Sequence, residues 1–171
     1  IGKDGQPPVP PLNMIGDFGG GSMFLVNGIL AAIIERAQTG RGNIVDAAIV
    51  DGTHSLMSFV HGMAGVGQWR AKREANLLDG AAPFYRCYMT ADGKFMAVGC
   101  IEPQFFAAMM ERLPIDREAY GAQHDHAAFA KQHEMLEDVF ATKTRDAWEA
   151  IFAGTDACVT PVLDYVQAAS H

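Results

Sequence analysis

The sequence predicts an α/β protein built from two parts, and three observations lead to this fold class. An apolar run at residues 23–34 has the length of a helix. Two runs rich in β-formers, residues 82–89 and 94–101, flank Asp92-Gly93, a strong hairpin signal. The composition changes near residues 76–80, between these regions, so we expect a boundary there.

Composition excludes some classes of protein. The chain of 171 residues is 49% hydrophobic and 19% charged, which is typical of a globular protein. Its formal net charge of −7 disfavours a surface for nucleic acid or an anionic membrane. The three cysteines, Cys87, Cys100 and Cys158, show no CxxC spacing, which favours buried thiols in a reducing, intracellular compartment.

No signal peptide or membrane span is expected. The longest apolar run, residues 23–34, is interrupted by Asn27 and Gly28 and is too short to cross a bilayer. The chain starts with a loop at residues 2–5, and residues 163–171 resemble a helix cut short. We therefore expect an internal fragment of a longer protein.

The first part should be mainly helical. A stiff proline arm at residues 7–11 leads to Asp17 and to three glycines, Gly19, Gly20 and Gly21, where we expect a sharp turn. A helix apolar on all sides, hence buried, should follow and stop at residues 39–42.

The rest of the chain should alternate between helices and short strands. Before the boundary we expect a strand at residues 43–49, a helix at 50–67 and an exposed connector at 68–76 with a small basic group. After the hairpin, Glu102 and Pro103 should open a helix to about residue 113. Further helices are expected at 124–142 and 145–152, and an extended segment at 158–162.

Two carboxylates are candidates for acid/base chemistry. Asp17 precedes the apolar helix beside the glycines, whose N–H groups we expect to be free donors at a helix start. Glu102 precedes the helix that begins at Pro103. Each could equally be an N-terminal cap, and the residue pattern alone does not decide between the two roles.

The histidines give a weaker signal. His54 and His61 are seven residues apart on one predicted helix, whereas a helical metal pair is normally spaced i, i+4. We therefore predict no metal site. His124, His126 and His133 lie in a polar region and are expected at the solvated surface.

Several stretches together resemble the family III CoA-transferases (CaiB/BaiF) and, within them, racemases of 2-methylacyl-CoA thioesters. These stretches are residues 16–24, 39–42, 45–52, 76–85, 91–99, 101–105 and 155–162. They occur in consistent order over nearly the whole chain, and residues 114–133 match least.

The resemblance implies a fragment of a two-domain fold. Residues 1–48 would end a Rossmann-like large domain that binds CoA, 49–80 would be a helical linker, and 81–171 an incomplete α+β small domain. The family's catalytic histidine and most CoA contacts would precede the chain, and none of its six histidines matches that position. Two subunits would interlock as a homodimer, with the active site between the large domain of one and the small domain of the other.

The resemblance also implies the chemistry. Asp17 matches the catalytic aspartate, and Glu102 matches the glutamate that partners the missing histidine. The reaction would invert C2 of an acyl-CoA through an enolate, with CoA as part of the substrate and no separate cofactor. We further expect the N–H groups of Gly19, Gly20 and Gly21 to bind the enolate oxygen.

Two alternatives stay open. A CoA transferase would use Asp17 as a nucleophile, and an inert fragment would act only in dimerisation or interaction. The expected location is intracellular: cytoplasmic in a bacterium, mitochondrial or peroxisomal in a eukaryote.

Overall fold

The computed structural model describes residues 2–171, which form two compact units. Unit 1 ends at Arg73, and unit 2 runs over Glu74–His171. The division lies a few residues before the change in composition at 76–80. The finer division at residues 48 and 80 stays a prediction.

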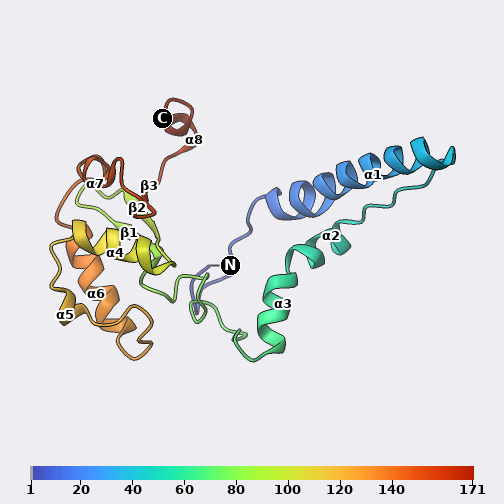
Figure 1. The fold of residues 1–171 in the computed structure, drawn as a ribbon. Helices are drawn as coiled ribbons and strands as arrows, with labels where there is room; N and C mark the ends of the chain where they lie inside the picture. Colours follow the sequence, from blue (N-terminus) through green and yellow to red (C-terminus); the bar gives the residue numbers. More distant parts are fainter. Residues whose placement is uncertain (1) are drawn as a thin grey trace. The chain divides into compact units, whose positions relative to one another are not determined.

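The regular elements of unit 1, among its described residues, are all helices (Figure 1). A π-helix, η1 (Met14–Ser22), continues directly into α1 (Met23–Thr39), and the N–H of Met23 donates to the carbonyl of Phe18, five residues back. Gly40, at φ 72°, ends α1 in the left-handed conformation, so the predicted helix stop is confirmed.

The expected glycine turn is wrong, because the helix already begins at Met14 and runs through the glycines. Their lack of side chains serves packing instead. α2 (Ile49–Leu56) crosses η1 so closely that a Cβ on Gly52 would overlap the carbonyl of Gly20. This close approach of two helices outweighs the poor helix propensity of glycine.

Two further predictions for unit 1 need correction. Residues 43–48 are extended but pair with no strand, and they run back alongside α1 (Figure 1), where Val45 faces Gly28. The single helix expected at 50–67 is two helices, α2 and α3 (Ser58–Gly65). They are separated at Met57, whose ψ is 1°. A strand pattern needs a partner strand, and unit 1 has none among its described residues.

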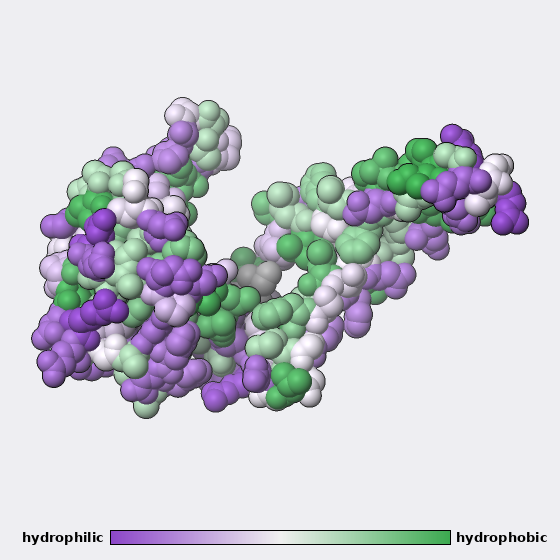
Figure 2. Space-filling model, in the orientation of Figure 1, coloured by the Kyte–Doolittle hydropathy of each residue, from purple (hydrophilic) through white to green (hydrophobic). Residues whose placement is uncertain are grey.

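α1 is exposed, not buried as expected. None of its residues is buried, and the side chain of Leu30 is 53% exposed. Figure 2 shows hydrophobic residues gathered on the surface over this helix. By length and composition alone the helix over Met14–Thr39 could cross a membrane, since it has 26 residues and contains an 18-residue window with a mean hydropathy of 1.5. This differs from the expectation drawn from the shorter run at residues 23–34. Helices from soluble cores meet the same criteria, so this is weak evidence for a membrane.

Unit 2 contains one antiparallel sheet in the order β1 (Tyr85–Met89), β2 (Phe95–Gly99), β3 (Val159–Pro161). Cys87 pairs with Ala97, which in turn pairs with Thr160. The Asp92-Gly93 turn joins β1 to β2, with Gly93 at φ 72°, so the predicted hairpin is confirmed.

The helices of unit 2 partly match expectation. They are α4 (Pro103–Arg112), α5 (Arg117–Tyr120), α6 (Phe129–Phe140), α7 (Arg145–Phe152) and α8 (Tyr165–Ala168). α4 and α7 confirm the predictions. The helix expected from His124 begins only at Phe129, because Asp125 accepts from the N–H of Ala127 and holds a turn there.

The core of unit 2 lies on one face of the sheet, where α6 packs on β1 and α7 on β2 and β3. Every buried hydrophobic residue of the described chain lies between Ala82 and Val159. Trp148 is fully buried, and its Nε1–H donates to the carbonyl of Phe140 at 2.9 Å. The opposite face of the sheet stays open and carries Cys87.

Candidate active site

Asp17 lies in the first turn of η1 with an exposed side chain. Among the described residues only the backbone of Asp17 forms hydrogen bonds: its N–H donates to the carbonyl of Asn13 at 3.2 Å, and its carbonyl accepts from Ser22 Oγ at 3.0 Å. The N-cap positions of η1 and α1 belong to Asn13 and Ser22, and neither helix has a side-chain cap. The structure therefore does not support the cap role, and the carboxylate faces solvent near a helix N-terminus.

The three glycines beside Asp17 are not at a helix start. Gly20 and Gly21 are buried inside η1, where N–H groups bond to carbonyls five residues back, as at Met23. A Cβ on Gly20 would also collide with Thr53 of α2. The expectation of free donors at Gly19, Gly20 and Gly21 therefore loses its basis, and their role in substrate binding stays a prediction.

Glu102 occupies the N-cap position of α4 but makes no side-chain capping bond. Its backbone is extended (φ −72°, ψ 141°), and its carbonyl accepts the first helical bond, from Phe106 at 3.0 Å. Pro103 follows and has no N–H that needs a partner. The exposed carboxylate of Glu102 thus lies at the positive end of α4 without being used to cap it.

Two cysteines lie near Glu102. Burial, followed by the charges of Asp156 and Glu102, raises the pKa of the Cys158 thiol. Burial raises the pKa of Cys100 to about 12, and the charge of Glu102 contributes in the same direction. The N–H of Gly99 donates to the carbonyl of Cys158 at 2.9 Å, so the end of β2, three residues before Glu102, lies beside the start of β3.

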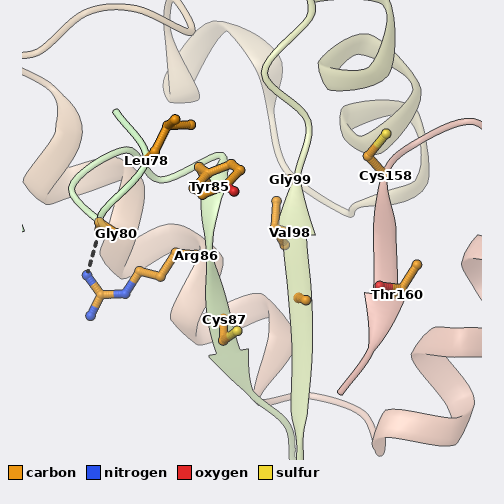
Figure 3. Close-up of a pocket in the computed structure, with 10 residues that line it drawn as sticks. Leu78, Gly80, Tyr85, Arg86, Cys87, Val98, Gly99, Cys158 and Thr160 are labelled. Carbon is orange, nitrogen blue, oxygen red and sulfur yellow. Dashed lines mark hydrogen bonds between the residues drawn. The ribbon is translucent and has the colours of Figure 1, made fainter. Parts of the chain in front are cut away.

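An open pocket of about 430 Å³ lies on the outer face of the same sheet (Figure 3). Its lining includes Tyr85 and Cys87 of β1, Gly99 of β2, Thr160 of β3 and Cys158 directly before β3. Arg86 at its edge donates to the carbonyl of Gly80 at 3.4 Å (Figure 3). Sequence reasoning missed this pocket, although the period-2 alternation of the hairpin, with Tyr88 buried and Cys87 exposed, predicts an outer face.

The histidines differ from expectation in one case. His54 and His61 stack with ring centroids 4.5 Å apart, and the described residues 2–171 contain no group of three or more potential metal ligands. His133 was expected in solvent, but it is half-buried. Its Nε2 lies 2.9 Å from the carbonyl of Ala81 and its Nδ1 3.3 Å from Tyr88 Oη, and burial lowers its pKa. α6 places it against the hairpin, which a pattern of polar neighbours does not reveal.

Asp17 and Glu102 belong to different units. Each is an exposed carboxylate near a helix N-terminus, unused as a cap. Such a group is available to take or give a proton. An arrangement of the two as an opposed pair stays a prediction.

The chain is similar to known proteins over its whole length. The chain is similar to alpha-methylacyl-CoA racemase from Mus musculus (47% identical) and from Homo sapiens (43%), over 171 residues that cover 100% of the chain and 45% of each relative. Succinyl-CoA:glutarate CoA-transferase from Homo sapiens is 25% identical over 166 residues, covering 94% of the chain and 37% of that protein. The chain thus spans about half the length, or less, of these relatives.

A solved structure supports the fold. The crystal structure of a hypothetical protein from Mycobacterium tuberculosis aligns with a TM-score of 0.62 at 18% identity, covering 98% of this chain and 44% of that one. The profile described as CoA-transferase family III matches residues 1–171. With a match over its full length, a mixed α/β architecture of the same kind and relatives above 40% identity, the chain belongs to CoA-transferase family III.

Proposed function

We propose that the complete protein carrying this chain is a racemase that inverts C2 of 2-methylacyl-CoA thioesters. The observation that carries the proposal is identity of 47% and 43% to two racemases over the whole chain, against 25% to a transferase. The substrate is an acyl-CoA, whose CoA moiety is part of the substrate and not a separate cofactor.

Inversion at C2 needs two acid/base groups on opposite faces of the substrate. One group takes the α-proton, which breaks the C–H bond and leaves the electron pair in an enolate. The other group returns a proton to the opposite face. In this proposal Asp17 serves one face, and Glu102 with a histidine outside this chain serves the other. Both carboxylates are exposed and free of capping bonds, as proton transfer requires.

The resemblance to the family also supports a proposal about assembly. Two subunits would interlock as a homodimer, so that Asp17 of one and Glu102 of the other act on one substrate. The exposed apolar face of α1 is compatible with such an assembly, because an unpaired apolar helix gains free energy when it is covered.

Exchange of the α-proton in deuterated water tests the reaction directly. The complete protein should incorporate deuterium at C2 of a 2-methylacyl-CoA. Asp17→Asn and Glu102→Gln should each slow incorporation by about 10²- to 10⁴-fold, the usual contribution of a positioned acid or base. Asp46→Asn and Glu111→Gln, at exposed positions of the same two units, are the matched controls and should leave the rate unchanged. Wild-type incorporation that persists in both active-site variants would overturn the assignment.

CoA transfer is the second candidate, because transferase relatives also match most of the chain. In that reaction the Asp17 carboxylate attacks the thioester carbonyl and expels CoA as a thiolate, which forms an acyl-enzyme anhydride. CoA moving to a free acid without deuterium at C2 would support transfer and exclude the racemase. The 171-residue chain by itself should show neither activity, which is also what an inert interaction fragment would do.

A further inference from the structure

The turn between β2 and α4 determines where Glu102 lies. β2 ends at Gly99 and α4 begins at Pro103, so the carbonyls of Cys100 and Ile101 belong to neither element. Buried or half-buried carbonyls of this kind need a donor from elsewhere. The direction of the chain at Glu102 depends on how these two carbonyls are held.

One side chain holds both. Nε2 of Gln123, in the loop before α6, donates to the carbonyl of Ile101 at 2.8 Å and to that of Cys100 at 3.1 Å. A primary amide has two N–H donors on one planar group, so a single residue can bridge neighbouring carbonyls. Two bonds from one rigid group restrict both the position and the rotation of the turn.

The loop that carries Gln123 is itself anchored to α6. Gln132 of α6, which is fully buried, donates from Nε2 to the carbonyls of Tyr120 at 3.1 Å and Ala122 at 2.9 Å. Lys131 Nζ donates to the carbonyl of Ala119 at 2.7 Å. A continuous path of hydrogen bonds therefore leads from α6 through the loop and Gln123 to the turn before Glu102.

Aromatic contacts also hold this loop. The rings of His124 and Phe84 pack edge to face with their centroids 5.2 Å apart. Phe84 packs in the same way against Phe106 of α4, with a centroid distance of 6.3 Å. Glu102 itself makes no side-chain cap, so its carboxylate is oriented by its backbone. Loop, hairpin and α4 thereby hold the backbone from which the carboxylate of Glu102 extends.

We propose that Gln123 is a positioning residue for Glu102, and this inference rests on the proposed function. A neutral donor suits the position. A carboxylate would repel two carbonyl oxygens, and an ammonium group would favour the ionised form of nearby Glu102. Because proton transfer depends on geometry at the scale of 1 Å, loss of this bridge should lower turnover without weakening substrate binding.

The test uses the complete protein and the deuterium-exchange assay. Gln123→Met keeps the length of the side chain and removes both donors. It should lower kcat about 10- to 100-fold with KM changed less than about twofold. Gln123→Glu should be impaired most at high pH and recover as the pH falls, because the protonated carboxyl regains one donor. Gln167→Met is the control, because it makes the same substitution in α8, at a residue whose side-chain oxygen accepts from Arg145 at 2.9 Å. It should lower stability without lowering kcat.

A double-mutant cycle separates positioning from general damage. If Gln123 acts through Glu102, adding Gln123→Met to the Glu102→Gln variant should lower kcat by less than about a further twofold. Multiplicative losses, or an unchanged kcat in a folded Gln123→Met variant, would overturn the inference while leaving the proposed function intact. Full exchange by Glu102→Gln alone would overturn the proposed role of Glu102 and this inference with it.

Discussion

The two units use apolar residues in opposite ways. Unit 2 gathers its large hydrophobic side chains into a closed core between Ala82 and Val159. In residues 2–73 the buried positions are glycines, Gly20, Gly21 and Gly52, while side chains such as Leu30 stay exposed. A segment can therefore be helical without contributing its side chains to a core. The hydrogen bonds of a helix lie within one segment, even though packing supplies most of its stability, whereas a core needs several elements that are close in space.

This difference extends to the candidate carboxylates. Glu102 is placed by a turn that a buried core and the Gln123 bridge support. Asp17 is placed by a helix that packs closely against α2 through its glycines. The two sites should therefore respond differently to substitutions in their surroundings.

The largest expected effect comes from the same leucine truncation in the two units. Leu136→Ala removes a fully buried side chain of unit 2 and should cost about 2–5 kcal/mol in the free energy of unfolding. Leu30→Ala in α1 should cost less than about 0.5 kcal/mol in the 171-residue chain. Urea unfolding followed by circular dichroism measures both. A cost above about 1 kcal/mol for Leu30→Ala would mean that this face is covered in solution.

A smaller effect is expected from alanine at two helical glycines of unit 1. Gly52→Ala places a Cβ into the backbone of Gly20 and should destabilise unit 1 by about 1–3 kcal/mol. Gly62→Ala in α3 meets nothing within 4 Å and should stabilise the helix by about 0.5–1 kcal/mol. Thermal melting of the helical signal distinguishes them. Equal melting temperatures would show that the η1–α2 contact is looser than described.

The smallest effect concerns the open face of unit 2 and is a difference in the rates at which its cysteines are alkylated. Cys87 and Cys158 are exposed, while Cys100 is buried with its pKa raised to about 12. Iodoacetamide should label Cys87 and Cys158 in the folded chain and spare Cys100, because the thiolate is the reactive form. Labelling of Cys158 should increase as the pH rises toward its raised pKa. Peptide mass spectrometry gives the rates, and rapid labelling of Cys100 at neutral pH would contradict the closed core.

Much of unit 2 is predictable from sequence because its signals are local. The Asp92-Gly93 turn, Pro103 at the start of α4 and the boundary of α7 depend on a few neighbouring residues. Residues 114–128 are not predictable in the same way, since their loop is held by Gln132 and by aromatic contacts distant in sequence.

The sequence by itself determined the mixed fold class, the hairpin, the family and the two candidate carboxylates. These follow from periodicity, turn chemistry and matched motifs, which are properties of the chain alone. The tertiary structure decided that the glycines lie inside a helix, that α1 is exposed, and that neither Asp17 nor Glu102 caps its helix. It also decided that Gln123 reaches the turn before Glu102. The physical reason is that burial and side-chain partners depend on which elements meet in space, and sequence spacing does not contain that information.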